Sequence, residues 1–166
     1  FSVEAARRGA SVQMIEPAGF FGERAKFFSK LFNVEDRLCV QKSMLNPTHH
    51  DVLKRSDTIL ALGVIYHLED LVEDLDLILD SKSTIVFESI GSLDIDWSDE
   101  QAWRYKQSEN LSLPWVWQRT KGSGYEIEFV PEWNRYCAAH AWGPDTNKSR
   151  QLWIARPTIE LKNNNL

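Results

Sequence analysis

The sequence contains little cysteine and no long apolar run. Its 166 residues include two cysteines, Cys39 and Cys137, each isolated among apolar neighbours. Two such thiols argue against a disulfide framework and against a zinc site, so we expect no metal and a reducing compartment, the cytoplasm. No apolar stretch approaches the roughly 20 residues that a membrane span needs, so we expect no membrane partner.

The sequence also lacks an excess of positive charge. Nineteen Lys and Arg residues face 24 Asp and Glu residues, for a formal net charge of -5. This balance argues against a protein that is basic all over and bound to nucleic acid, although it leaves room for a local basic patch. There is no internal repeat and no low-complexity linker, and the length suits a single domain over 1–166.

What is present is an alternation of strand and helix patterns. Apolar periodicity predicts strands over 11–16, 37–42, 57–62 and 83–89, separated by helices over 20–32, 47–55 and 71–79. The first of these helices has six large apolar residues to bury: Phe20, Phe21, Phe27, Phe28, Leu31 and Phe32. This order predicts an α/β fold with a parallel sheet, covered by helices and connected by right-handed crossovers.

The composition changes after Ile90, because all seven tryptophans follow it. We predict helices over 97–109 and 131–141, strands over 125–130 and 151–156, and a frayed tail over 163–166. Four tryptophans, Trp97, Trp103, Trp115 and Trp117, could stack on a planar acceptor or fill the core of a small cap over the sheet. We favour the core, since large aromatic side chains dominate core energetics.

The most informative segment is LALGVIYHLED, residues 60–70. An apolar run over 58–62 breaks at Gly63 and passes to Tyr66, His67 and Asp70. A buried parallel strand that ends this way opens on a binding crevice, because ligands of open α/β sheets sit beyond the carboxyl ends of the strands. Glycine at this position would let a ligand lie close to the backbone.

These segments resemble a known family. FSVEAARRGASVQMIEP (1–17) is similar to the stretch after the glycine-rich loop of class I S-adenosylmethionine-dependent methyltransferases. LALGVIYHLED resembles the fourth-strand segment of that family, and FVPEWNRYCAAHAWG followed by RQLWIARP resembles its last helix and strand. The nearest group is that of the tRNA wobble-uridine (cmo5U) methyltransferases. The resemblance implies a Rossmann-like doubly wound, mostly parallel sheet with an antiparallel C-terminal strand. It also implies S-adenosylmethionine as cofactor and methyl transfer to a small molecule or an RNA nucleoside such as one of tRNA.

The family pattern also implies a first strand and a GxGxG loop upstream of Phe1, because residues 1–9 already read as helix. We therefore expect the sequence to be truncated at its N-terminus. A chain that truly began at Phe1 would lack half of the cofactor pocket, and we expect no activity from it.

Three residues are candidates for the adenosine end of the cofactor. Glu16, at the tip of a strand, can accept two hydrogen bonds from ribose hydroxyls. It could equally be a solvated strand end, and it would fit a nicotinamide dehydrogenase. Ser43 and Met44 follow the next strand, where the resemblance implies the adenine ring. A turn serine before Asn46 is an equally good interpretation of Ser43.

The central segment supplies the remaining candidates. Leu62 and Gly63 would present carbonyl groups to the ammonium of the cofactor, and Tyr66 and His67 would face the transferring methyl. Since histidine titrates near neutrality, His67 is the preferred catalytic base, with Glu88 of the next strand as the second choice. Alternatively, Tyr66 and His67 only support the loop by packing.

Two other function classes stay open. An NAD-dependent oxidoreductase would share the sheet and the acidic strand end. A non-catalytic binding subunit with a methyltransferase fold would keep the core but lose the cofactor contacts. An intact upstream GxGxG loop would distinguish the enzyme from the binding subunit.

Overall fold

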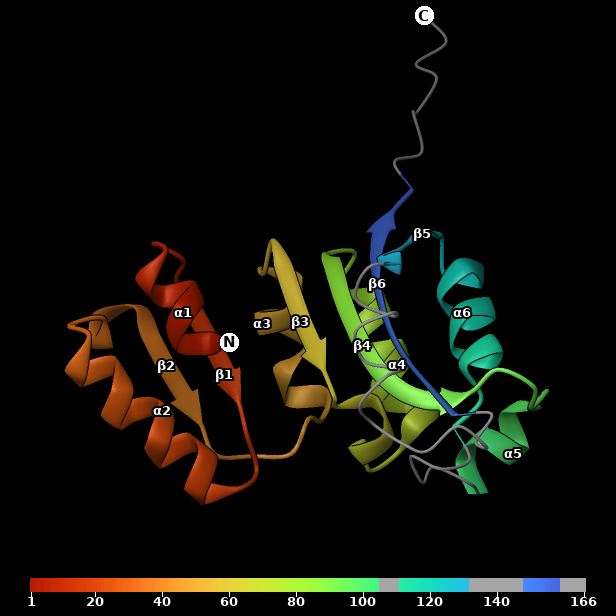
Figure 1. Ribbon diagram of the computed structural model, residues 1–166, viewed down its shortest axis with the longest axis horizontal. Helices are drawn as coiled ribbons and strands as arrows, with labels where there is room; N and C mark the ends of the chain where they lie inside the picture. Colours follow the sequence, from red (N-terminus) through yellow and green to blue (C-terminus); the bar gives the residue numbers. More distant parts are fainter. Residues whose placement is uncertain (105–110, 132–147, 159–166) are drawn as a thin grey trace, which may run out of the picture. The chain divides into compact units, whose positions relative to one another are not determined.

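The computed structural model describes residues 1–104, 111–131 and 148–158 (Figure 1). The chain divides into two compact units, Phe1–Asn46 and Pro47–Leu166, and each is described by itself. Three predictions lie wholly or partly outside the described residues. They are the helix over 131–141, of which only residue 131 is described, the tail over 163–166, and residues 105–110 of the helix predicted over 97–109.

The first unit contains two parallel strands and two helices. β1 (Val12–Ile15) pairs with β2 (Leu38–Gln41) in parallel, with Val12 opposite Leu38 and Ile15 opposite Gln41. The helices are α1 (Ser2–Arg7) and α2 (Gly19–Leu31), and the 3₁₀ turn η1 (Glu35–Arg37) leads into β2. Both predicted strands and the longer predicted helix are confirmed.

The prediction of what α2 buries is wrong. Its six large apolar residues, Phe20 to Phe32, are all exposed, whereas Gly22, Ala25 and Ser29 are buried. A Cβ atom on Gly22 would lie 3.2 Å from Cγ1 of Val40, so α2 approaches β2 closely through its small residues. Periodicity located an apolar face correctly, but the sheet covers a different face of the helix.

The second unit is built on a four-stranded sheet in the order β3-β4-β6-β5 (Figure 1). β3 (Thr58–Leu62) and β4 (Thr84–Ser92) are parallel, while β6 (Lys148–Pro157) runs antiparallel to both β4 and β5 (Tyr125–Phe129). The predicted antiparallel insertion of the last strand beside the parallel ones is confirmed. The hydrogen bonds nevertheless place β1 and β2 in one sheet and β3 and β4 in another, whereas the sequence predicted one sheet.

Helices and turns of this unit connect the strands. They are η2 (Pro47–His49), α3 (His50–Lys54), η3 (Ile65–His67), α4 (Leu71–Asp80), α5 (Asp99–Arg104) and α6 (Leu113–Gly122). We did not predict α6, although its start carries two signals. The Ser112 hydroxyl accepts a hydrogen bond from the Trp115 amide at 3.2 Å, and Pro114 occupies the first turn.

The core of the second unit lies around β4. The rings of Phe87 and Trp153 stack at 5.3 Å between centroids, and neither is exposed to solvent. α4 buries Leu71, Leu75, Ile78 and Leu79, the face that its periodicity predicts. Trp97 and Trp115 are buried too, which favours the core interpretation of the tryptophans. The side chains of Trp103, Trp133 and Trp142 lie outside the described residues.

Candidate cofactor and acceptor sites

In the first unit, the structure brings Glu16 and Ser43 to one strand edge. The amides of both residues donate to the carbonyl oxygen of Gln41, at 3.0 Å for Glu16 and 3.2 Å for Ser43. The Glu16 side chain is half-buried, and its Oε1 accepts a hydrogen bond from the Ala18 amide at 2.8 Å. A carboxylate has about four acceptor positions, so this bond orients Glu16 and leaves acceptor capacity for a ligand.

Met44 lies beside Ser43 with an exposed side chain. Its carbonyl oxygen accepts a hydrogen bond from the Asn46 side-chain amide at 3.1 Å, which fixes the turn that follows β2. An exposed thioether next to this turn could pack against a flat ring. The three predicted adenosine contacts therefore share one edge of the first unit.

In the second unit, β3 ends in a tight turn at Gly63. Its φ of 67° is left-handed, a conformation that favours glycine, and its amide donates to the Glu88 carbonyl at 2.8 Å. Leu62, the last residue of β3, is half-buried opposite Glu88. The break that the sequence predicts at Gly63 is thus the point at which β3 leaves its ladder with β4.

Tyr66 and His67 lie together in the turn η3, but they are differently placed. Their rings are 4.4 Å apart between centroids and tilted by 54°. Tyr66 is half-buried and returns toward the strand end, since a Cβ atom on Gly63 would lie 3.4 Å from its hydroxyl oxygen. His67 is exposed, and its ring has no hydrogen bond to any residue that the structure describes. Of the two, Tyr66 therefore lines the turn at Gly63.

Two carboxylates hold the loop between η3 and α4. Asp70 caps α4 by accepting hydrogen bonds from the amides of Val72 and Glu73, at 3.2 and 3.1 Å. Asp74 reaches back from α4 and accepts from the amides of Glu69 and Asp70, both at 3.1 Å. Burial raises the pKa of the Asp74 carboxyl above its ordinary value, although these bonds oppose the shift. Asp70, the last residue of the YHLED run, therefore has a structural role.

An ion pair between the buried Glu88 and the half-buried Arg150 adjoins Gly63 and Tyr66. Glu88 of β4 is 3% exposed, and a Cβ atom on Gly63 would lie 3.5 Å from its Oε2. The Arg150 guanidinium of β6 donates to both carboxylate oxygens, with Nη2 at 3.2 Å from Oε2. Burial, and secondarily the charge of Glu88, raises the pKa of the Tyr66 phenol, which keeps it protonated. Sequence reasoning ranked Glu88 second as a base and missed Arg150, which no local pattern links to it.

The adjacent residues His49 and His50 have their side chains in different surroundings. His49 is buried, while Nε2 of His50 lies 2.9 Å from Oδ2 of Asp80. Within the described residues, no group of three or more His, Cys, Asp or Glu side chains could hold a metal ion. No helix in the described part of the chain is long and apolar enough to cross a membrane.

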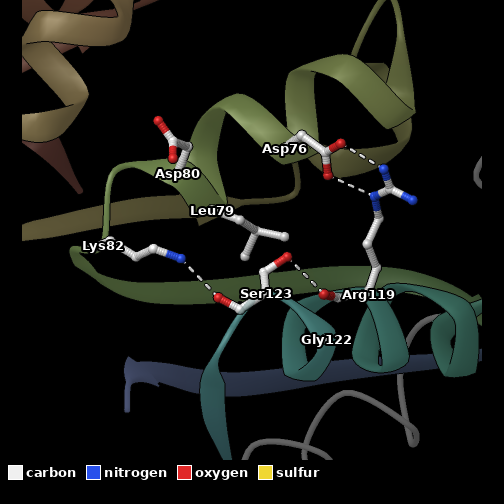
Figure 2. A pocket seen from close by; sticks show the side chains of 7 residues that line it. All are labelled: Asp76, Leu79, Asp80, Lys82, Arg119, Gly122 and Ser123. Atoms are coloured by element: carbon white, nitrogen blue, oxygen red, sulfur yellow. Dashed lines mark hydrogen bonds and ion pairs between the residues drawn. The ribbon is translucent and has the colours of Figure 1, made fainter. Parts of the chain in front are cut away.

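One hollow of the second unit lies away from these residues (Figure 2). It has a volume of about 470 Å³ and is lined by the end of α4 and the end of α6. Arg119 makes two hydrogen bonds to Asp76, at 2.7 and 2.5 Å, and Lys82 donates to the Ser123 carbonyl at 2.8 Å. Because Asp80 and Lys82 precede β4, the hollow lies at the amino end of that strand, opposite Gly63. Its charges serve to hold the two helices together.

Three solved structures are similar to this chain over most of its length. The N-terminal domain of EvdMO1 with SAH bound has a TM-score of 0.64 and 15% identity, covering 93% of this chain and 68% of that domain. A protein from Galdieria sulphuraria assigned as a sarcosine dimethylglycine methyltransferase has a TM-score of 0.62 and 13% identity, covering 95% and 76%. The (4+2) cyclase SpnF has a TM-score of 0.63 and 10% identity, covering 94% and 70%.

The chain has a Rossmann-like methyltransferase fold. It spans 32% of full-length EvdMO1. No protein-family model matches the sequence, and no curated protein matches it either. At these identities the similarity establishes the fold, and the reaction has to be argued from the residues.

Proposed function

We propose that this chain belongs to an S-adenosylmethionine-dependent methyltransferase that acts on a small molecule or an RNA nucleoside. The proposal rests on two strand ends, each described within its own unit. In a fold shared with a structure that has SAH bound, β1 ends in an oriented carboxylate and β3 ends in a left-handed glycine. SAH is the product that remains when S-adenosylmethionine has given up its methyl group.

The first unit is proposed to bind the adenosine end. Glu16, held by the Ala18 amide, would accept hydrogen bonds from ribose hydroxyls with its remaining lone pairs. Ser43 and Met44, one turn beyond β2, would contact the adenine ring through the hydroxyl and the thioether. The Glu16 carboxylate suits the diol of a ribose, and the Ser43 and Met44 side chains suit a neutral ring; these side chains do not suit a phosphate.

The second unit is proposed to bind the methionine end and the acceptor. The carbonyl groups of Leu62 and Gly63 would accept hydrogen bonds from the ammonium group of the cofactor. The Glu88 carboxylate beside them is paired with Arg150, so the carbonyl groups carry this part of the proposal. S-adenosylmethionine, when bound, supplies a methyl group on a positively charged sulfur. Tyr66 would orient the acceptor through its protonated hydroxyl, and His67 would take up the proton of the acceptor.

SpnF supports a second candidate function, since its name assigns a cyclisation to a protein of the same fold. A chain of this fold that binds the cofactor without transferring its methyl group is therefore the main alternative. An NAD-dependent oxidoreductase is the third. Its cofactor would also place a ribose diol at Glu16, so Glu16 alone does not distinguish it from a methyltransferase.

Calorimetric titration with S-adenosylmethionine, SAH and NADH tests the proposal. The protein should carry the residues that we expect upstream of Phe1, with the 166-residue chain measured beside it. Glu16→Ala should weaken binding of S-adenosylmethionine by about 1.5 to 3 kcal/mol, the scale of hydrogen bonds to a charged group. Glu35→Ala, which removes an exposed carboxylate from the same unit, is the control and should change nothing.

Each outcome separates the alternatives. Binding of S-adenosylmethionine and SAH without competition by NADH excludes the oxidoreductase, and release of SAH in the presence of an acceptor then distinguishes a methyltransferase from a chain that only binds the cofactor. Tight NADH binding overturns the proposal in favour of the oxidoreductase. Unchanged affinity in Glu16→Ala would show that the ribose lies elsewhere.

A further inference from the structure

Helix α2 presents an aromatic face that nothing in its own unit covers. We use this name for Phe20, Phe21, Phe27, Phe28, Leu31 and Phe32. Phe20, Phe27 and Leu31 are 66%, 64% and 59% exposed, and they recur at intervals of seven and four residues, along one side of the helix. The opposite side, with Gly22, Ala25 and Ser29, packs toward β2. A contiguous apolar surface of this kind marks an interaction site.

Basic side chains border the aromatic face. The Arg24 guanidinium lies 5.1 Å from the centroid of the Phe20 ring, and Arg7 of α1 lies 4.6 Å from that of Phe32. Lys26 and Lys30 follow on the adjoining side of α2. Long basic side chains that lie on aromatic rings can keep their charged ends at the rim while the rings enter an apolar medium.

The charge distribution along the sequence points the same way. Residues 1–46 contain seven Lys and Arg and five Asp and Glu, whereas residues 47–166 contain twelve and nineteen. In a protein with an overall charge of -5, the unit that carries the aromatic face thus has a net charge of +2, and the other unit has a net charge of -7. Such a surface complements an anionic partner with an apolar interior.

We propose that α2 docks onto an anionic lipid surface, with the helix lying in the plane of the interface. An interfacial helix of this class has Phe and Leu on one face and Lys and Arg beside them, and α2 has both. The lipid-facing aromatic rings would be buried at the level of the headgroups. Arg24 and Lys30 would meet the phosphate and carboxylate groups of the headgroups. Arg7 and Lys26 are paired with Glu4 and Glu23, at 2.9 and 3.2 Å, so they would contribute less. The absence of a membrane-crossing helix among the described residues does not bear on this, because an interfacial helix does not cross the bilayer.

A second copy of the chain fits the same face less well. In a two-fold pairing the same patch meets itself, which would bring Arg24 of one copy toward the centre of the patch of the other. Two guanidinium groups would then be desolvated together, which is costly without a carboxylate between them. Lipid headgroups supply that negative charge directly.

Vesicle co-sedimentation tests the proposal with the 166-residue chain. Vesicles of phosphatidylcholine mixed with phosphatidylserine are compared with vesicles of phosphatidylcholine alone, at low and high salt. We expect binding to the mixed vesicles that weakens with salt. Arg24→Gln should weaken it by about fivefold, the effect of one basic residue near an anionic surface. The double variant Phe27→Ser, Leu31→Ser should weaken it by about tenfold or more.

Two controls make these results specific. Leu93→Ser removes an exposed apolar side chain from the other unit and should bind vesicles like the unchanged protein. All four residues changed are exposed or at the helix surface, so the variants should unfold at the same temperature as the parent. A variant with a lowered unfolding temperature is replaced by Phe20→Ser, which alters the same face at its first turn.

Three results would overturn the proposal. The first is no binding to mixed vesicles. The second is equal binding of the parent and the double variant. The third is a concentration-dependent dimer in light scattering that the double variant abolishes, because it would assign the aromatic face to a second copy.

Discussion

Arg150 on β6 donates two hydrogen bonds to the carboxylate of Glu88 on the neighbouring strand β4, and this ion pair lies beside the turn at Gly63. Glu88 is almost wholly buried, and Arg150 is its ionic partner. A buried charge that loses its partner is far more costly than the pair is stabilising. The pair therefore couples the antiparallel strand to the proposed acceptor end of the site.

Removing Arg150 should expose this dependence. Arg150→Met, which keeps an unbranched stem and removes the guanidinium, should destabilise the protein by about 2 to 4 kcal/mol in urea unfolding, because it leaves Glu88 unpaired. The double variant Glu88→Gln, Arg150→Met should recover part of the loss. If the double variant is as unstable as the sum of the single variants, the two side chains are not energetically coupled.

Gly63 should tolerate no side chain, for two separable reasons. Gly63→Ala forces an alanine into the left-handed conformation, which costs about 1 to 2 kcal/mol. It also places a methyl group between the Tyr66 hydroxyl and the Glu88 carboxylate. Gly124→Ala is the matched control, since its φ of 80° is also left-handed but no atom lies within 4 Å of the added Cβ. Both variants should lose stability, and only Gly63→Ala should lose affinity for S-adenosylmethionine. Equal affinities in calorimetry would remove Gly63 from the proposed site.

Asp99 should contribute measurably to the loss of folding stability at acid pH. Its Oδ1 accepts a hydrogen bond from Nε1 of Trp115 at 2.9 Å, and this bond, then the charge of Arg119, lowers the pKa of Asp99 below its ordinary value of 3.8. A lowered pKa in the folded state means stability that is present above pH 3.8 and lost as the pH falls through the folded-state pKa.

The variant Asp99→Asn keeps an acceptor oxygen and removes the charge. It should reduce the difference in unfolding free energy between pH 6 and pH 3 by about 0.5 kcal/mol or less, because the carboxylate is largely exposed. The measurement is urea unfolding followed by tryptophan fluorescence at pH 3 and pH 6. Asp96→Asn, at a nearby exposed position, is the control and should leave the dependence intact.

The fold could be predicted where local pattern and tertiary structure agree. The strand over 58–62, its break at Gly63 and the buried face of α4 all follow from short-range periodicity and one glycine. The surface of α2 could not, because periodicity identifies an apolar face but not which face the sheet will cover. Here three small residues allowed a closer approach to β2 than the phenylalanines would.

The candidate site also contains residues that local sequence could locate and residues that only the tertiary structure brings together. Glu16, Ser43, Leu62 and Gly63 lie at strand ends, which a sequence can locate within a residue or two. Arg150 lies 62 residues after Glu88, and only the antiparallel pairing of β6 with β4 brings them together. Exposure also separates Tyr66 from His67, which the sequence could treat only as a pair.

The proposed chemistry makes a final prediction for this pair. If His67 takes the proton of the acceptor, His67→Ala should lower turnover roughly 10²-fold and leave the affinity for S-adenosylmethionine nearly unchanged. The readout is SAH released in the presence of a panel of small amines and unmodified tRNA, using the protein with its expected upstream residues.

Tyr66→Phe separates orientation from packing, because it keeps the ring against His67 and removes only the hydroxyl near Gly63. A large loss of turnover would assign that hydroxyl to holding the acceptor, whereas no loss would leave Tyr66 as part of the wall. Full turnover in His67→Ala would mean that the acceptor arrives deprotonated or that another group serves it. Glu88 would then be a poor replacement, since its carboxylate is already engaged by Arg150. An acceptor that needs no base would be the simpler explanation, and acceptors that are already ionised at neutral pH should then be methylated fastest.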